Sequence, residues 1–360
     1  MSELPNSHHA LIRNLSALRG RVAVLGVQDA RLLPALAGVD AGLAMTDQAG
    51  VHDALRAAAG EARVWQTAFG YDDVGLATAA WDTVVVFLPK ARAELDLRLA
   101  LAASLAASGA RLMLIGEKRE GIAGAIKQLR AFAPDAAKLD SARHCQVWVA
   151  SAPASPSPFQ VDDWLQWDTV ARPAAPEEGF VVAGLPGVFS LGRLDEGTAL
   201  LLDSLAKFPL LAGPTLDFAC GAGVIGAWLH RHEQARGMSP RPVDGLDVQA
   251  QAVFCARQTY QRHGVSGELL AADGLDGLAA RRRWSAVVTN PPFHTGVKTD
   301  LSMSERFLAS VRSHLAPGGE LRVVANAFLP YEAALQQQFG QVERLLETRK
   351  FIVYRAFRRR

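Results

Sequence analysis

Short apolar runs alternate with longer amphipathic stretches along the whole chain. The stretches between the runs carry Ala, Leu and Arg at helical spacing. The runs, which are rich in Val and Leu, lie at 21–27, 82–89, 110–116, 215–219, 243–248, 285–290 and 320–326. Strands separated by amphipathic helices predict parallel sheets in doubly wound α/β domains.

A segment rich in Pro, Ala and Ser interrupts this alternation at 150–179. Such a composition is typical of a connector between domains, although Trp164 and Trp167 indicate that part of it is packed. The sequence therefore predicts two domains, at 1–152 and 153–360.

The two halves resemble each other in sequence. Segments that begin at 81, 107 and 144 match segments that begin at 284, 316 and 350, in the same order. This order favours a duplicated Rossmann-like domain, and chance similarity among Val-rich strands is the alternative. The first half has "FLPK" where the second has "NPPF", and it lacks the glycine loop and the strand-end acids of the second. It is predicted to be a degenerate copy without a cofactor site.

A glycine-rich loop follows the strand predicted at 215–219, in the stretch "TLDFACGAGVIGAWL". Gly221, Gly223 and Gly226 match the G-x-G-x-x-G spacing, and glycines there permit a tight turn and close backbone approach to a ligand. We expect Ala219, Gly221 and Gly223 to contact a nucleoside cofactor. The spacing alone does not choose between a nicotinamide cofactor and another nucleoside ligand.

Acids stand at the ends of three successive predicted strands. Asp217 would suit a cationic, amine-bearing ligand, and Asp247 would accept hydrogen bonds from ribose hydroxyls. Asp273 would accept a hydrogen bond from an adenine amine. Their neighbours Val248 and Gly274 are expected to line the same crevice. The alternative for each acid is a strand-end cap or turn residue, but the carboxyl ends of parallel strands line one crevice.

The fourth strand ends in "NPPF", at Asn290, Pro291, Pro292 and Phe293. Two prolines would stop any strand, and this motif could have that structural role alone. The two prolines also make a stiff turn. On this turn, the amide oxygen of Asn290 and a proline carbonyl could accept hydrogen bonds from both N–H groups of an exocyclic amine. The aromatic ring could then stack on the base that carries the amine.

These motifs resemble the class I S-adenosylmethionine-dependent methyltransferases that modify exocyclic amines. The stretches that begin at 185, 290 and 318 resemble the ribosomal RNA small-subunit methyltransferase C family more narrowly. In the first half, "IGEKREGI" and "KLDSARHC" are similar to that family's degenerate N-terminal domain. Ser285 is a departure, because such enzymes often carry Asp before the apolar run.

The resemblance implies S-adenosylmethionine as cofactor and the N2 amine of a guanine in 16S rRNA of the small ribosomal subunit as acceptor. Asn290 would then contact both the cofactor and the acceptor guanine. Phe189 and Asp195 would close over the cofactor, unless they only cap the helix that follows. The same motifs also fit adenine N6 or a protein glutamine amide as acceptor. A non-catalytic RNA-binding assembly factor and a nicotinamide dehydrogenase are two further possibilities from different functional classes.

Composition adds limits to this interpretation. The chain has 360 residues, of which 49% are hydrophobic. Its net charge is only +2, so any contact with RNA must come from local basic patches. Cys145, Cys220 and Cys255 have no metal-ligand spacing, so we expect no metal and a reducing cytoplasm. No signal pattern or membrane-length apolar run is visible, and a monomer is expected. The candidate RNA contacts are Arg281, Arg282, Arg283 and Lys298.

Overall fold

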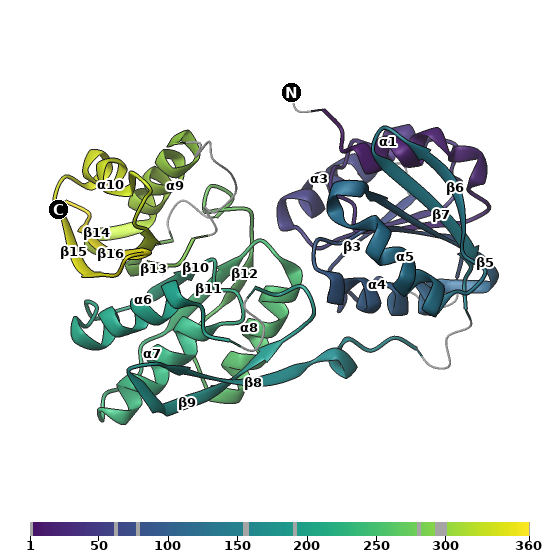
Figure 1. Cartoon of the computed structure of the whole chain (residues 1–360). Helices are drawn as coiled ribbons and strands as arrows, with labels where there is room; N and C mark the ends of the chain where they lie inside the picture. The colour runs from purple at the N-terminus through teal and green to yellow at the C-terminus, as the bar shows by residue number, and fades with distance from the viewer. Residues whose placement is uncertain are drawn as a thin grey trace. The chain divides into compact units, whose positions relative to one another are not determined.

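The chain folds into two compact units, Met1–Leu165 and Gln166–Arg360 (Figure 1). The boundary lies later than the one predicted at 152/153. Phe159, Val161 and Trp164 pack against the core of the first unit, so this part of the connector belongs to that unit. The computed structural model describes residues 3–60, 64–76, 80–153, 158–189, 193–278, 282–291 and 301–359.

The first unit is built on a seven-stranded sheet of order β3-β2-β1-β4-β5-β7-β6. Strands β1 to β5 pair in parallel, and β7 runs antiparallel to both β5 and β6. Its described elements are α1 (Asn6–Arg13), η1 (Leu15–Ala17), β1 (Val22–Leu25), α2 (Leu32–Ala35), β2 (Gly42–Thr46), α3 (Ala49–Ala59), β3 (Trp65–Phe69), β4 (Trp81–Phe87), α4 (Arg92–Leu105), β5 (Ala106–Glu117), η3 (Lys118–Glu120), α5 (Ile122–Phe132), β6 (Ala137–Ala142), β7 (Cys145–Ser151) and η4 (Val161–Trp164).

The second unit repeats this topology in a seven-stranded sheet of order β12-β11-β10-β13-β14-β16-β15. Here too the last strand pairs are antiparallel. The same order in both sheets confirms the predicted pair of doubly wound domains. The described elements are β8 (Gln166–Arg172), β9 (Ala175–Gly184), α6 (Glu196–Lys207), β10 (Thr215–Phe218), α7 (Val224–Ala235), β11 (Val243–Asp247), α8 (Ala250–His263), β12 (Leu269–Ala271), β13 (Trp284–Thr289), α9 (Leu301–His314), β14 (Leu315–Asn326), α10 (Tyr331–Phe339), β15 (Val342–Glu347) and β16 (Phe351–Phe357).

Each sheet is buried on both faces, and for this reason the sequences of its strands are continuous apolar runs. In β13, Val287 points into the core formed with α9 and α10. Its neighbours Ala286 and Val288 point into the core formed with α6 and α7. Because the side-chain period of a strand is two, both faces need apolar residues.

The segment after the boundary is a β-hairpin and not a plain connector. Strands β8 and β9 pair antiparallel as a two-stranded sheet. Val170, Phe180 and Val182 of this hairpin are buried in the same core as α6 and α7. The hairpin is thus a fixed part of the second unit and forms one side of its candidate site.

In the first unit, Arg98 of α4 fills the space over the carboxyl ends of the central strands. Its guanidinium donates to the carbonyl of Phe87 at 2.9 Å, to the carboxylate of Asp47 at 3.1 Å and to the hydroxyl of Tyr71 at 3.0 Å. A Cβ on Gly26, the residue after β1, would lie 2.0 Å from Nη1 of Arg98. The first unit therefore keeps one strand-end acid, Asp47, but an internal cation already binds it.

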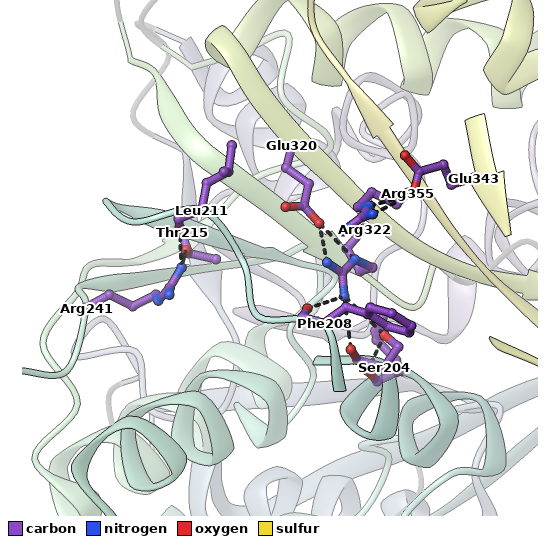
Figure 2. A network of polar contacts seen from close by, with 10 residues as sticks. Ser204, Phe208, Leu211, Thr215, Arg241, Glu320, Arg322, Glu343 and Arg355 are labelled. Atoms are coloured by element: carbon purple, nitrogen blue, oxygen red, sulfur yellow. Dashed lines mark hydrogen bonds and ion pairs between the residues drawn. The ribbon is translucent and has the colours of Figure 1, made fainter. Parts of the chain in front are cut away.

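The second unit contains a buried ion pair between Arg322 and Glu320, both on β14 (Figure 2). The Arg322 guanidinium also donates to the carbonyls of Ser204 at 3.3 Å and Phe208 at 3.1 Å. These carbonyls lie at the end of α6. The Ser204 carbonyl also accepts from the Phe208 amide at 2.8 Å, and the Phe208 carbonyl lies past the last helical residue, where carbonyls have no intrahelical donor. Burial lowers the pKa of Arg322, and the charge of Glu320 opposes this effect. The pair fastens the end of α6 to the sheet.

Replacing Arg322 with Met should destabilise the second unit by about 3 to 5 kcal/mol, because Glu320 would be left as a buried, uncompensated charge. Adding Glu320→Leu to that variant should recover part of the loss. Arg355→Met is the matched control, because its partner Glu343 is half exposed and surface pairs contribute about 1 kcal/mol or less. Urea unfolding of the full chain measures all three. A double variant no more stable than Arg322→Met would contradict the assigned role of the pair.

Candidate active site

The order of the second sheet reverses between β10 and β13, which are neighbours. In open α/β sheets, ligands bind outside the carboxyl ends of the strands at such a reversal. Phe218 pairs with Thr289, so the residues that follow the two strands emerge side by side. These are the glycine loop, defined here as residues 219–223, and Asn290. The structure thus brings the two predicted motifs together.

The glycine loop has a left-handed backbone at Ala219, Gly221 and Gly223, with φ of 57°, 53° and 80°. Gly223 is also the N-cap of α7. A Cβ on Gly221 would meet no atom within 4 Å, so this part of the loop faces open space. Backbone exposed in this way at the start of a helix can approach a polar ligand closely. The loop fits a nucleoside cofactor such as S-adenosylmethionine.

The third glycine of the motif has a different role. A Cβ on Gly226 would lie 1.9 Å from the hydroxyl oxygen of Tyr260 on α8. Gly226 is therefore needed so that α7 and α8 can pack closely, and it does not contact the space in front of the loop.

Asp247, the last residue of β11, holds the glycine loop in place. Its carboxylate accepts hydrogen bonds from the Gly221 amide at 2.9 Å and from the Gln249 amide at 3.0 Å. Burial raises the pKa of the Asp247 carboxyl, and these amide donors oppose that shift. The residue is partly exposed at the carboxyl end of β11, where ribose hydroxyls could reach it. Val248 lies beside it and is also partly exposed.

Asp217 is enclosed, in contrast to the prediction that it faces a cationic ligand. Its side chain is fully buried, and neither carboxylate oxygen accepts a hydrogen bond of good geometry from the described residues. Burial raises the pKa of Asp217 well above its usual range, and the nearby charge of Asp247 adds to the shift. Because Asp217 is fully buried, unlike Asp247, direct contact between its carboxylate and a ligand is not supported.

Asn290 is held by two residues at the start of α6. Its side-chain nitrogen donates to the carboxylate of Asp195 at 2.8 Å and to the hydroxyl of Thr198 at 2.9 Å. An ionised carboxylate only accepts hydrogen bonds, so the NH₂ group of the amide must face Asp195. The amide oxygen of Asn290 therefore points away, and it accepts no hydrogen bond from the described residues.

Asp195 caps the helix that follows, as one of its two predicted roles requires, and it also holds Asn290, while its contact with a cofactor stays a prediction. It is the N-cap of α6 and accepts a hydrogen bond from the Thr198 amide at 3.0 Å. The same oxygen accepts the bond from Asn290. Gly197 makes room for this contact, because a Cβ there would lie 3.0 Å from that oxygen and 3.4 Å from the Asn290 nitrogen.

One pocket joins the glycine loop, Phe189, Asp195 and Asn290. Phe189 lies in its wall and is 68% exposed, so its ring is available to a ligand. Asp168 of β8 and Thr198 of α6 also line this pocket, and neither was predicted from the sequence. The spacing Asp-x-x-Thr at the predicted helix start could have identified Thr198, because the third helical residue bonds to the N-cap. No local signal marks Asp168.

The remaining predicted residues are distributed as follows. Asp273 is exposed just after β12, and Gly274 beside it has a left-handed φ of 81°. Pro291 is buried next to Asn290. Pro292, Phe293, Arg281 and Lys298 lie outside the described residues.

The structure does not bring Arg282 and Arg283, two of the candidate RNA contacts, to the pocket. They precede β13 and thus stand at its amino end, opposite to Asn290. Arg282 is engaged in ion pairs of 2.8 Å with both Asp244 and Glu268.

Within the described parts of the chain, no helix is long and apolar enough to span a membrane. No three potential ligands among those residues are grouped to hold a metal ion.

Comparisons with known proteins agree with this geometry. Residues 179–355 match the family model described as methyltransferase small domain, and residues 8–167 match the model of its N-terminal domain. A solved 16S rRNA N2 methyltransferase of T. thermophilus, in complex with AdoMet and guanosine, aligns with a TM-score of 0.82 at 23% identity. The alignment covers 99% of this chain and 92% of that one, and it supports the two-unit fold.

Curated relatives establish the family. The ribosomal RNA small subunit methyltransferase C of Pseudomonas aeruginosa (strain LESB58) is 48% identical over 79% of this chain and 82% of its own length. Its namesake in Hahella chejuensis is 39% identical over 99% of this chain and 100% of its own length. With matches of this extent at this identity, the chain belongs to the ribosomal RNA small subunit methyltransferase C family.

Proposed function

We propose that the chain transfers a methyl group from S-adenosylmethionine to the exocyclic N2 amine of a guanine in 16S rRNA. The observation that carries this proposal is the orientation of Asn290, whose amide oxygen is turned away from Asp195 and Thr198. An oxygen fixed in this way accepts a hydrogen bond from an N–H group. It therefore suits an amine acceptor and does not suit an acceptor atom that lacks hydrogens.

The chain's own residues align the amine and hold the cofactor. The Asn290 oxygen and the Pro291 carbonyl would accept the two N–H bonds, which leaves the nitrogen lone pair directed outward. When bound, S-adenosylmethionine supplies a methyl group that its sulfonium already activates, so alignment is the main requirement. Asp247 and the glycine loop would hold the ribose and methionine parts. Asp273, exposed after β12, would accept from the adenine amine.

Adenine N6 and a glutamine amide carry similar N–H groups, so the Asn290 geometry alone fits them too. Membership in the family favours guanine in 16S rRNA. We propose further that the acceptor is met in the context of the small ribosomal subunit, by a monomer in the cytoplasm. A nicotinamide dehydrogenase would have no use for an oriented amide at the end of β13.

The full chain should bind one molecule of S-adenosylhomocysteine and not two. In the first unit, Arg98 occupies the space at the carboxyl ends of the strands where the second unit would hold the cofactor. Isothermal titration calorimetry reports the stoichiometry directly, and titration with NAD is the matched control for the cofactor. A stoichiometry of two would show that the first unit is also a cofactor site.

Asp247→Ala should weaken binding of S-adenosylhomocysteine by about 1.5 to 3 kcal/mol, since ribose hydroxyls would lose a charge-assisted partner and the Gly221 amide would lose its acceptor. Glu343→Ala is the control, because it removes a carboxylate of the same unit on the edge strand β15. Calorimetry on both variants, with melting temperatures measured alongside, tests the assignment. Unchanged affinity in Asp247→Ala would remove this residue from the site.

Asn290→Ala should lower the single-turnover rate of 16S rRNA methylation on the order of a hundredfold or more, because an aligning hydrogen bond of this kind is worth a few kcal/mol. Affinity for S-adenosylhomocysteine should change little. Thr198→Val removes one of the two bonds that orient the amide and should cause a smaller loss, which Thr198→Ser restores. If Asn290 only ends a strand, activity will instead follow the folded fraction measured by thermal unfolding.

A further inference from the structure

Phe328 is an exposed aromatic residue that the candidate active site does not use. Its side chain is 80% exposed, and the other exposed phenylalanine among the described residues is Phe189 of the pocket. Phe328 follows β14, which runs parallel to β13, so it lies at the same end of the sheet as Asn290. Exposed aromatic rings at a ligand-binding edge are candidates for stacking.

The turn that carries Phe328 is stiff. The Leu329 amide donates to the Asn326 carbonyl at 3.0 Å, and the Tyr331 amide donates to the Leu329 carbonyl at 2.7 Å. Pro330 then caps α10. A ring presented on such a backbone loses little conformational entropy when it binds.

Contacts along β16 place this turn close to Asn290. The Ala327 amide donates to the Lys350 carbonyl at 2.8 Å, and Asn326 pairs with Phe351. The ring of Phe351 lies 3.3 Å from the position that a Cβ on Gly197 would take, and Asn290 lies 3.4 Å from the same position. Phe328 therefore lies next to the strand β16 that contacts the start of α6, at the same end of the sheet as Asn290.

Two cations accompany the ring. Arg349 and Lys350 are exposed, and Arg349 has no carboxylate partner in the part of the chain that the structure describes. Lys350 pairs with Glu196 at 2.8 Å, but both side chains are about two-thirds exposed, at 68% and 67%. An exposed pair contributes little energy, so the ammonium can exchange its partner for a phosphate.

We propose that Phe328, Arg349 and Lys350 form a contact surface for the single-stranded RNA next to the target guanine; this inference rests on the proposed function. The ring would stack on a neighbouring base while the two cations meet backbone phosphates. An aromatic ring flanked by cations is the combination that single-stranded nucleic acids require. A protein interface would instead need a larger cluster of exposed apolar side chains. In this turn Phe328 and Pro330 are exposed, and Ala327 and Leu329 are only partly exposed.

The test is binding of a fluorescein-labelled RNA hairpin with a guanine in its single-stranded loop, followed by fluorescence anisotropy on the full chain. Phe328→Ala should weaken binding by roughly 5- to 100-fold, as loss of one base stack does. Phe328→Trp should restore it, which a residue with a merely structural role would not show. Met238→Ala removes an exposed apolar side chain ahead of β11, at the opposite edge, and should have no effect.

The contribution of the cations is measured separately, by the salt dependence of RNA binding. Arg349→Gln should weaken binding and lower the slope of log affinity against log salt concentration by about one, whereas Phe328→Ala should leave that slope unchanged. Arg283→Gln at the opposite edge is the control for charge. All variants should bind S-adenosylhomocysteine as the unmodified chain does.

Methylation of unmodified 16S rRNA, supplied both as a transcript and within small ribosomal subunits, separates this inference from the proposed function. If the unmodified chain methylates either substrate and Phe328→Ala binds the hairpin equally well, the contact surface is wrong and the function stands. If the unmodified chain methylates neither substrate, the proposed function fails, and the anisotropy still reports whether Phe328 binds RNA. A Phe328→Ala variant that changes only the melting temperature would assign the ring to the fold, and one that changes only the sedimentation coefficient would assign it to a contact between copies of the chain; either result would overturn the inference.

Discussion

The hydrogen bonds from the Asn290 amide to Asp195 and Thr198 are the constraint on which the candidate site depends. An asparagine side chain has a donor end and an acceptor end of nearly equal shape, and only its partners decide which end faces a ligand. The carboxylate of Asp195 admits the donor end alone. The site is thereby committed to an acceptor that carries N–H groups before any substrate arrives.

The position of that carboxylate is set by packing far from the pocket. Asp195 stands at the start of α6, and buried leucines of this helix, Leu201, Leu202 and Leu205, pack on the sheet. At the other end of the helix, the buried Arg322 donates hydrogen bonds to the carbonyls of Ser204 and Phe208 (Figure 2). A helix fixed at its far end and along its apolar face presents its N-cap in one place. Stability of the core and geometry of the site are therefore linked through α6.

The two units show how one topology reaches two outcomes. Both sheets have the same strand order, and both place an acid after or at the end of the second strand, Asp47 and Asp247. In the first unit the guanidinium of Arg98 lies at the carboxyl ends of the strands and pairs with both that acid and Glu94. In the second unit a glycine loop leaves the edge open, and Asp247 binds a loop amide instead. At this end of the sheet, the two units differ in the Arg98 cation of the first and the glycine loop of the second.

The sequence by itself determined the doubly wound class, the position of the glycine loop and the strand that ends at Asn290. These follow from apolar runs and from glycine and proline chemistry, which act locally along the chain. Only the tertiary structure decided that Asp195, 95 residues away, orients that amide, that Asp217 is enclosed, and that Arg282 faces the opposite edge. Local patterns show that a residue is polar and follows a strand. Its partners and its burial are set by residues distant in sequence, and only packing brings these together.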